Sequence, residues 1–78
     1  MISACILIRT TSGKFDKVVE GMKQFKDVKK AFAVLGRYDV VVDLEAENFV
    51  KLSETALRMA RMGGVVFIET LIQAPVEV

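Results

Sequence analysis

The sequence predicts an α+β fold of order βαββαβ, in which four strands form one antiparallel sheet and two helices cover one face. Two observations predict it. Extended apolar runs alternate with two amphipathic helical segments, and the two βαβ halves share a layout without sequence identity. At 78 residues the chain is short, so residues 1–78 are expected to form a single domain.

The first strand and the first helix follow from local patterns. An apolar run at residues 4–8 predicts the strand, and polar residues at 9–13 predict a turn. Ser12 is the expected N-cap of the helix, with Asp16 in its first turn. Apolar residues then recur at helical spacing at Phe15, Val18, Val19, Met22 and Phe25.

Two strands in the middle of the chain are expected to form a hairpin. Mostly apolar residues at 28–35 and 38–45 are separated by the dipeptide Gly36-Arg37, which predicts a tight turn. Gly36 is expected to adopt a positive φ angle there, because glycine does so without steric cost.

The second helix is expected to start at Asn48 as its cap and to stop at Gly63-Gly64. Met59 and Met62 are interpreted as packing residues. The last strand runs from Val65 to Gln73 and ends at Pro75. The helix has apolar residues at Phe49, Leu52, Ala56, Leu57 and Ala60, and basic residues near its end at Arg58 and Arg61. A ferredoxin-like plait accommodates this order with right-handed crossovers.

One face of this sheet has no helix to cover it. If Ile6, Ile8, Val40, Val42 and Leu44 point at the helices, alternation places a second apolar set on the other face. That set is Cys5, Leu7, Ala31, Ala33, Leu35 and Val41, and the charged residues expected beside it are Arg9, Asp39, Asp43 and Glu45. The composition is 53% hydrophobic with a mean hydropathy of +0.40, which is more apolar than one small core requires. We therefore expect a face-to-face homodimer, a dimeric α/β barrel.

Composition excludes several kinds of protein. The longest stretch without a charged residue is 1–8, far short of the roughly 20 apolar residues of a membrane span, and it lacks the features of a signal peptide. A soluble, cytoplasmic protein without a membrane partner is expected. Cys5 is the single cysteine and histidine is absent, which excludes an internal disulfide, Cys/His zinc sites and His-based catalysis. We expect no metal and no cofactor.

Basic residues are concentrated in the first half of the chain. Residues 1–39 hold eight Lys or Arg against four Asp or Glu, whereas residues 40–78 hold three against six. Five lysines fall around the first helix and its exit, at Lys14, Lys17, Lys23, Lys26 and Lys29. A solvated helix face is the favoured interpretation, and nucleic-acid binding is the alternative.

Four short motifs occur in order along the chain. They are Thr11-Ser12-Gly13-Lys14, the hairpin at 34–42 with its Gly-x-Tyr-Asp turn, Gly64-Val65, and Glu69-Thr70-Leu71-Ile72. Over essentially the whole chain this set resembles a stand-alone RAM domain, the effector-binding domain of the leucine-responsive/asparagine (Lrp/AsnC) regulators. The resemblance implies a ferredoxin-like domain that dimerises sheet to sheet and assembles into an octameric or decameric ring. Small effectors, typically amino acids, are bound in clefts between dimers.

Full-length members of that family carry an N-terminal helix-turn-helix domain that reads DNA. Met1 here directly precedes the first strand, so we expect no helix-turn-helix domain and no direct DNA binding. The resemblance then implies a role in transcriptional regulation of amino-acid metabolism, through ligand sensing or through co-assembly with a full-length Lrp/AsnC relative.

The resemblance places the effector cleft at the hairpin turn and on the last strand. Asp39 can accept from the ammonium of an amino acid, and backbone N–H groups around Gly36 and Arg37 can donate to its carboxylate. Tyr38 offers an aromatic wall. The full set is Leu35, Gly36, Arg37, Tyr38, Asp39, Ile68 and Thr70. Ile68 stands where family members often have a hydroxyl residue, which removes one polar contact.

Several of these residues also have a structural interpretation. Gly36 can serve the turn alone, Asp39 can cap the turn or pair between subunits, Tyr38 can pack at an interface, and Thr70 can be an ordinary strand residue. Two other functions also remain open. A purely structural subunit needs no ligand, and a small dimeric plait enzyme uses the space between sheet and helices. Catalysis there generally requires a histidine or an acid–base pair, so we expect no enzyme.

Overall fold

The computed structural model describes residues 1–74 and has the predicted βαββαβ order. Its elements are β1 (Ile2–Thr10), α1 (Phe15–Met22), β2 (Val28–Ala33), β3 (Val40–Ala46), α2 (Phe49–Ala60) and β4 (Val65–Ile72). All neighbouring strands are antiparallel, in the order β2-β3-β1-β4. The predicted ferredoxin-like plait is confirmed. Pro75, the predicted end of the last strand, lies outside the described residues.

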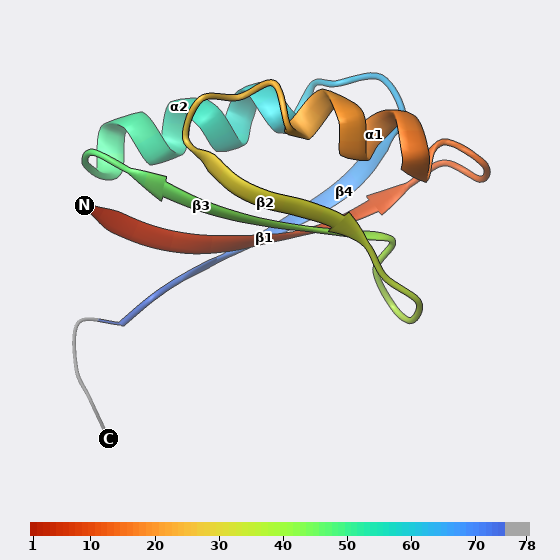
Figure 1. The fold of residues 1–78 in the computed structure, drawn as a ribbon, viewed down its shortest axis with the longest axis horizontal. Helices are drawn as coiled ribbons and strands as arrows, with labels where there is room; N and C mark the ends of the chain where they lie inside the picture. The colour runs from red at the N-terminus through yellow and green to blue at the C-terminus, as the bar shows by residue number, and fades with distance from the viewer. Residues whose placement is uncertain (75–78) are drawn as a thin grey trace.

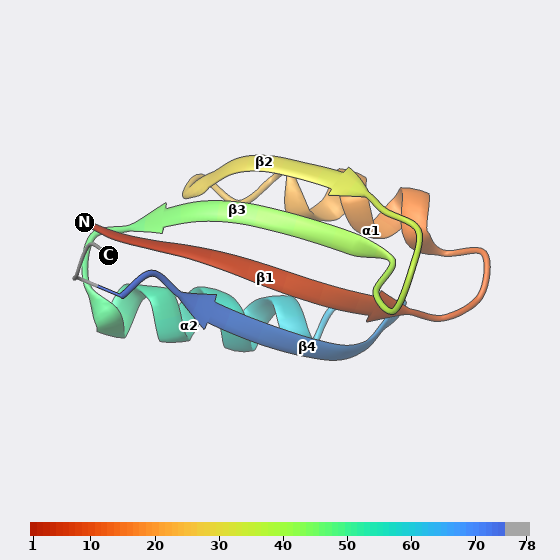
Figure 2. The ribbon, with the colours of Figure 1, turned by 90° about the horizontal axis from the view of Figure 1, so that it is seen from below.

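Both helices lie on the same side of the sheet (Figure 1). Seen from below, the other face of the sheet is not covered by any described residue of the chain (Figure 2). We call it the open face. Strand register and alternation assign its side chains, which are Ser3, Cys5, Leu7, Arg9, Lys30, Phe32, Val41, Asp43, Glu45, Phe67, Glu69 and Leu71.

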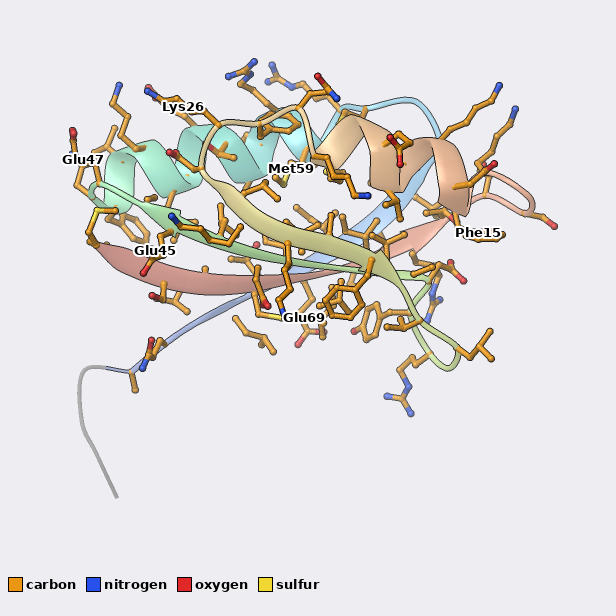
Figure 3. All side chains as sticks on the ribbon, viewed as in Figure 1. Phe15, Lys26, Glu45, Glu47, Met59 and Glu69 are labelled. Carbon is orange, nitrogen blue, oxygen red and sulfur yellow. The ribbon has the colours of Figure 1, made fainter. Side chains whose placement is uncertain are left out.

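The core fills the space between the helices and the sheet. Alternate residues of β1 and β3 are fully buried there, as the period of two in a strand requires. The large side chains with almost no exposed surface are Ile6, Ile8, Val18, Met22, Val40, Val42, Leu44, Leu52 and Met59. Figure 3 shows Met59 between α2 and the sheet, where it packs as predicted. Burying each such side chain contributes about 1.5–3 kcal/mol of hydrophobic stabilisation.

Strand β2 corrects part of the predicted open face. Ala31 pairs with Val42, and Ala33 pairs with Val40. Residues directly opposite each other on neighbouring strands point to the same face, so both alanines face the helices. Phe32 points to the open face in their place. Leu35 lies beyond the end of β2 and is fully exposed, so it does not belong to that face either.

The first helix starts later and ends earlier than its sequence pattern suggests. Ser12 is not the N-cap: Lys14 occupies that position, without a capping bond from its side chain. The preceding residues form a turn in which Gly13 has a φ of +77° and the Lys14 N–H donates to the Thr11 carbonyl at 3.1 Å. Asp16 stands in the first turn as predicted. Phe25 follows the helix but still packs against the core.

The second helix confirms its predicted cap and corrects its predicted inner face. The Asn48 side chain accepts a hydrogen bond from the Lys51 N–H at 2.9 Å. Its buried residues are Leu52, Thr55 and Met59. Phe49 and Leu57 are each 60% exposed, because a straight helix turns only one stripe toward the sheet.

Replacing the α2 cap is expected to destabilise the protein measurably. Asn48→Ala removes the acceptor for the Lys51 N–H, so we expect the free energy of unfolding to fall by about 1 kcal/mol. In a domain of this size that corresponds to roughly 4–8 °C in Tm, measured by thermal unfolding monitored by circular dichroism. Asn48→Asp keeps an acceptor and is the matched control. Equal losses for the two variants would contradict the capping role.

Candidate functional site

The segment that connects β2 and β3 is a six-residue loop, residues 34–39, rather than the predicted tight turn at Gly36-Arg37. The Val34 N–H donates to the Asp39 carbonyl at 2.9 Å and closes its base. Gly36 has a φ of +143°, which confirms the predicted positive angle. Space is not the reason for glycine here, because a Cβ at Gly36 would meet no described atom within 4 Å. Backbone conformation alone therefore favours it.

Asp39 ties this loop to the end of β1. Its Oδ2 atom accepts hydrogen bonds from the Thr10 backbone N–H at 2.8 Å and from the Thr10 hydroxyl at 3.4 Å. The Asp39 N–H donates to the Ile8 carbonyl at 2.8 Å. These contacts correspond to the capping interpretation of Asp39. They engage one carboxylate oxygen and fix the side chain in place.

Tyr38 joins the loop to β4 across the open face. Its hydroxyl donates to Glu69 Oε1. The guanidinium carbon of Arg9 lies 6.0 Å from the centre of the Tyr38 ring, at the outer limit of a cation–π contact, and Arg9 Nη2 donates to the Arg37 carbonyl at 3.3 Å. The loop, β1 and β4 thus contribute one polar cluster, Arg9, Arg37, Tyr38 and Glu69.

Glu69 was missing from the predicted site residues. It lies between Ile68 and Thr70, so the alternation of the strand turns it to the face opposite theirs. The motif Glu69-Thr70-Leu71-Ile72 contained it, and that alternation was the signal that could have singled it out. Figure 3 shows Glu69 below the sheet, on the side away from the helices.

The cluster changes the acidity of Tyr38. The hydrogen bond to Glu69 is the main cause that raises the pKa of the Tyr38 phenol above its usual value, with burial and the carboxylate charge acting in the same direction. Arg37 and Arg9 oppose this shift. Because its pKa is raised, the Tyr38 phenol is still neutral at a pH equal to the usual tyrosine pKa, and it still donates this hydrogen bond there. The bond is lost when pH passes the raised value.

Glu69→Gln is expected to lower the pKa of Tyr38 toward its usual value, because a weaker neutral hydrogen bond replaces the charge-assisted one that is the main cause of the raised pKa, and the negative charge is removed. Tyr38 is the single tyrosine and the chain has no tryptophan, so the ultraviolet absorbance of phenolate reports this group alone. A spectrophotometric pH titration measures the shift. Glu47→Gln on the α2 side is the control and should leave the titration unchanged. An unaltered midpoint in Glu69→Gln would contradict the contact.

Ile68 and Thr70 lie apart from the loop cluster. They pair with Ile8 and Ile6, whose side chains are buried under the helices. Ile68 packs against the core, and both residues are partly buried on the helix side of β4. Within one chain, the predicted site is therefore divided between the two faces of the sheet. The loop itself projects away from the sheet (Figure 1), and Leu35 within it is fully exposed.

Comparison with known families identifies the kind of domain. The profile of the Lrp/AsnC ligand binding domain matches residues 3–74, nearly the entire chain. The chain belongs to the Lrp/AsnC ligand-binding domain family. In this Lrp/AsnC domain, the matched region includes all the strands and helices described above except Ile2, the first residue of β1, together with the 34–39 loop.

Solved structures of similar length share the fold of this Lrp/AsnC domain. The hypothetical protein PHS023 from Pyrococcus horikoshii is 29% identical, with a TM-score of 0.89 over 95% of this chain and 90% of that one. FFRP-DM1 is also 29% identical, with a TM-score of 0.91 over 95% of this chain and 100% of that one. No curated protein matches the sequence.

A longer neighbour is the transcriptional regulator NMB0573 from Neisseria meningitidis, whose structure is a complex with L-Met. It is 16% identical, with a TM-score of 0.80 over 94% of this chain and 49% of that one. At this identity the similarity is one of fold.

Other chemistry is sparse in the described part of this Lrp/AsnC domain. Residues 1–74 contain no group of three or more His, Cys, Asp or Glu side chains arranged to hold a metal ion. Burial raises the pKa of the Cys5 thiol, and the carboxylate of Asp43, its cross-strand neighbour, raises it further. The thiol is therefore neutral and weakly nucleophilic near pH 7. Neither helix in residues 1–74 is long and apolar enough to cross a membrane.

Proposed function

We propose that the protein binds an amino acid or a related small metabolite and, as an oligomer, serves transcriptional regulation of amino-acid metabolism. The match of residues 3–74 to the Lrp/AsnC ligand binding domain carries this proposal. The L-Met complex of a neighbour with the same fold is consistent with an amino-acid ligand. The family is one of ligand-binding regulatory domains, in keeping with a function other than catalysis.

The 34–39 loop offers the groups that a zwitterion needs. Asp39 supplies a fixed carboxylate with a second oxygen for the ligand ammonium. The N–H groups of Gly36 and Arg37 donate to no acceptor within residues 1–74, so they are available for the ligand carboxylate. Tyr38 and the exposed Leu35 supply apolar surface beside them. These remain the proposed contacts, together with Ile68 and Thr70.

Oligomerisation is part of the proposal, because the loop and β4 of one chain do not form a closed pocket. The open face supports a sheet-to-sheet dimer. Its apolar members Phe32, Phe67 and Leu71 are between 41% and 52% exposed, and apolar side chains gathered on one uncovered face are typical of an interaction site. A second copy packed against this face removes that surface from water. A larger ring then brings loops of one dimer toward β4 of another.

A thermal-shift screen with the twenty amino acids, followed by calorimetry, tests the binding. A ligand at a hundred times its Kd stabilises the folded state by about 2.7 kcal/mol. For a domain of this size, we expect the Tm to rise by more than roughly 10 °C with the correct amino acid and by little with the others.

A chain whose Tm responds to none of them would contradict effector binding and favour a purely structural subunit. The exposed open face is the observation that favours that second function. Mixing with a full-length Lrp/AsnC regulator and measuring mass by light scattering would then detect mixed oligomers.

A further inference from the structure

A groove lies in the helix layer, on the opposite side of the sheet from the 34–39 loop and the open face. It runs between the outer side of α2 and the segment that joins α1 to β2, and has a volume of about 660 Å³. Figure 3 shows Lys26 at this upper side of the molecule, far from Glu69 beneath the sheet. The residues that matter here are Phe25, Lys26, Lys51, Leu57, Arg58 and Arg61.

The groove carries an excess of positive charge. Four basic side chains line it, against two acidic ones, Asp27 and Glu54. Within residues 1–74, the only ion pairs join Lys23 to Glu20 and Lys29 to Glu45, and neither involves a basic residue of the groove. None of the four basic side chains is held in an ion pair within the described residues, and basic side chains outnumber acidic ones in the groove, which favours an anionic partner.

Apolar surface is interleaved with these charges. The Arg58 guanidinium carbon lies 5.2 Å from the centre of the Phe25 ring, which holds the cation over the aromatic face. Leu57, one residue earlier, is 60% exposed. An arginine positioned in this way next to exposed leucine suits a ligand that combines carboxylates with apolar side chains.

We propose that this groove is a docking site for an acidic peptide segment of a partner protein. From Lys51 to Arg61, α2 advances by roughly 15 Å, which matches about four or five residues of an extended peptide. Basic residues stand at both ends of this length, and Leu57 and Phe25 lie between them. A compact anion can reach the basic residues at only one end. A peptide with glutamates on both sides of a leucine can contact the basic residues at both ends together with Leu57 and Phe25.

The probe for this site is a short fluorescein-labelled peptide of glutamates with spaced leucines, titrated with the full chain and followed by fluorescence anisotropy. Arg61→Glu is expected to weaken its binding about fivefold at low salt, because reversing one partly exposed charge changes the free energy by about 1 kcal/mol. Lys17→Glu is the matched control. It makes the same change of net charge on α1, outside the groove, and is expected to leave the Kd within twofold, a change near the limit of measurement.

Two further probes decide the class of ligand. The same peptide with glutamine in place of glutamate is expected to bind at least about fivefold more weakly, since it lacks the charges. Inorganic pyrophosphate is expected to compete poorly. Equal weakening by Lys17→Glu and Arg61→Glu would overturn the proposal by showing a response to net charge alone. Tight binding of the glutamine peptide, or complete displacement by pyrophosphate at a concentration below the peptide's Kd, would overturn it as well.

Discussion

Val41→Lys is expected to convert the proposed dimer into a monomer. Val41 lies on the open face at the centre of the sheet, between Leu7 on β1 and Phe32 on β2. A two-fold dimer buries two copies of each such residue, and burying an ammonium group without a partner costs several kcal/mol. We expect the dimer Kd to rise by roughly a hundredfold or more, which is about 3 kcal/mol. Sedimentation velocity at micromolar concentration measures the change in mass.

The monomer should tolerate this lysine. Val41 is only partly buried in a single chain, so the ammonium group of a lysine at this position reaches water there and stays hydrated. Val50→Lys is the matched control, because Val50 lies on α2 away from the open face and is 64% exposed. It makes the same change of side chain and should leave the mass unchanged. A wild-type protein that sediments as a monomer, or a Val41→Lys protein that remains a dimer, would contradict the proposed interface.

The fold could be predicted because its strongest signals are local. A short stretch of sequence is enough to show the period-two alternation of β1 and β3. The same holds for the apolar residues at helical spacing in the two helices. Asn48 is followed at Lys51 by the N–H that it caps, so this element boundary was also predictable. Ser12 carried the same type of signal but failed. Gly13, which follows it, has a left-handed backbone conformation, so the helix begins only at Phe15.

The faces of β2 required information that no short segment holds. Ala31 and Ala33 were assigned to the open face from alternation along their own strand. Their true face is decided by pairing with Val42 and Val40, on a neighbouring strand. The irregular pairing between Val28 and Lys30 adds one residue to β2 and could not be anticipated from composition.

The candidate site was predictable as a segment but not as a set of contacts. Glycine at position 36 and its positive φ follow from the turn alone. The bonds from Tyr38 to Glu69 and from Asp39 to Thr10 connect residues 31 and 29 positions apart, and depend on how β1 lies between β3 and β4. The types of two residues so far apart in the sequence do not indicate whether their side chains are close in space. Only the register brings them together.

Asp39 has two roles that substitutions can separate, one structural and one proposed for the ligand. In Asp39→Ala, the Thr10 N–H loses its acceptor, and an unsatisfied, partly buried donor costs about 1–3 kcal/mol. Asp39→Asn keeps an amide oxygen for that N–H and removes only the charge. We expect the free energy of unfolding, measured by urea denaturation, to fall by less than half as much in Asp39→Asn as in Asp39→Ala.

Effector affinity should not distinguish the two variants in the way that stability does. If the Asp39 carboxylate accepts from the ligand ammonium, both variants lack the charge, and both should weaken amino-acid binding by roughly tenfold or more in calorimetry. Glu47→Gln, the same loss of charge at an exposed site, should keep the wild-type Kd. An Asp39→Asn protein that binds as tightly as the wild type would leave Asp39 with its capping role alone. The ammonium would then have to be held by another acceptor. Glu69 is one candidate, because it accepts a hydrogen bond from Tyr38, which is adjacent to Asp39 in the same loop.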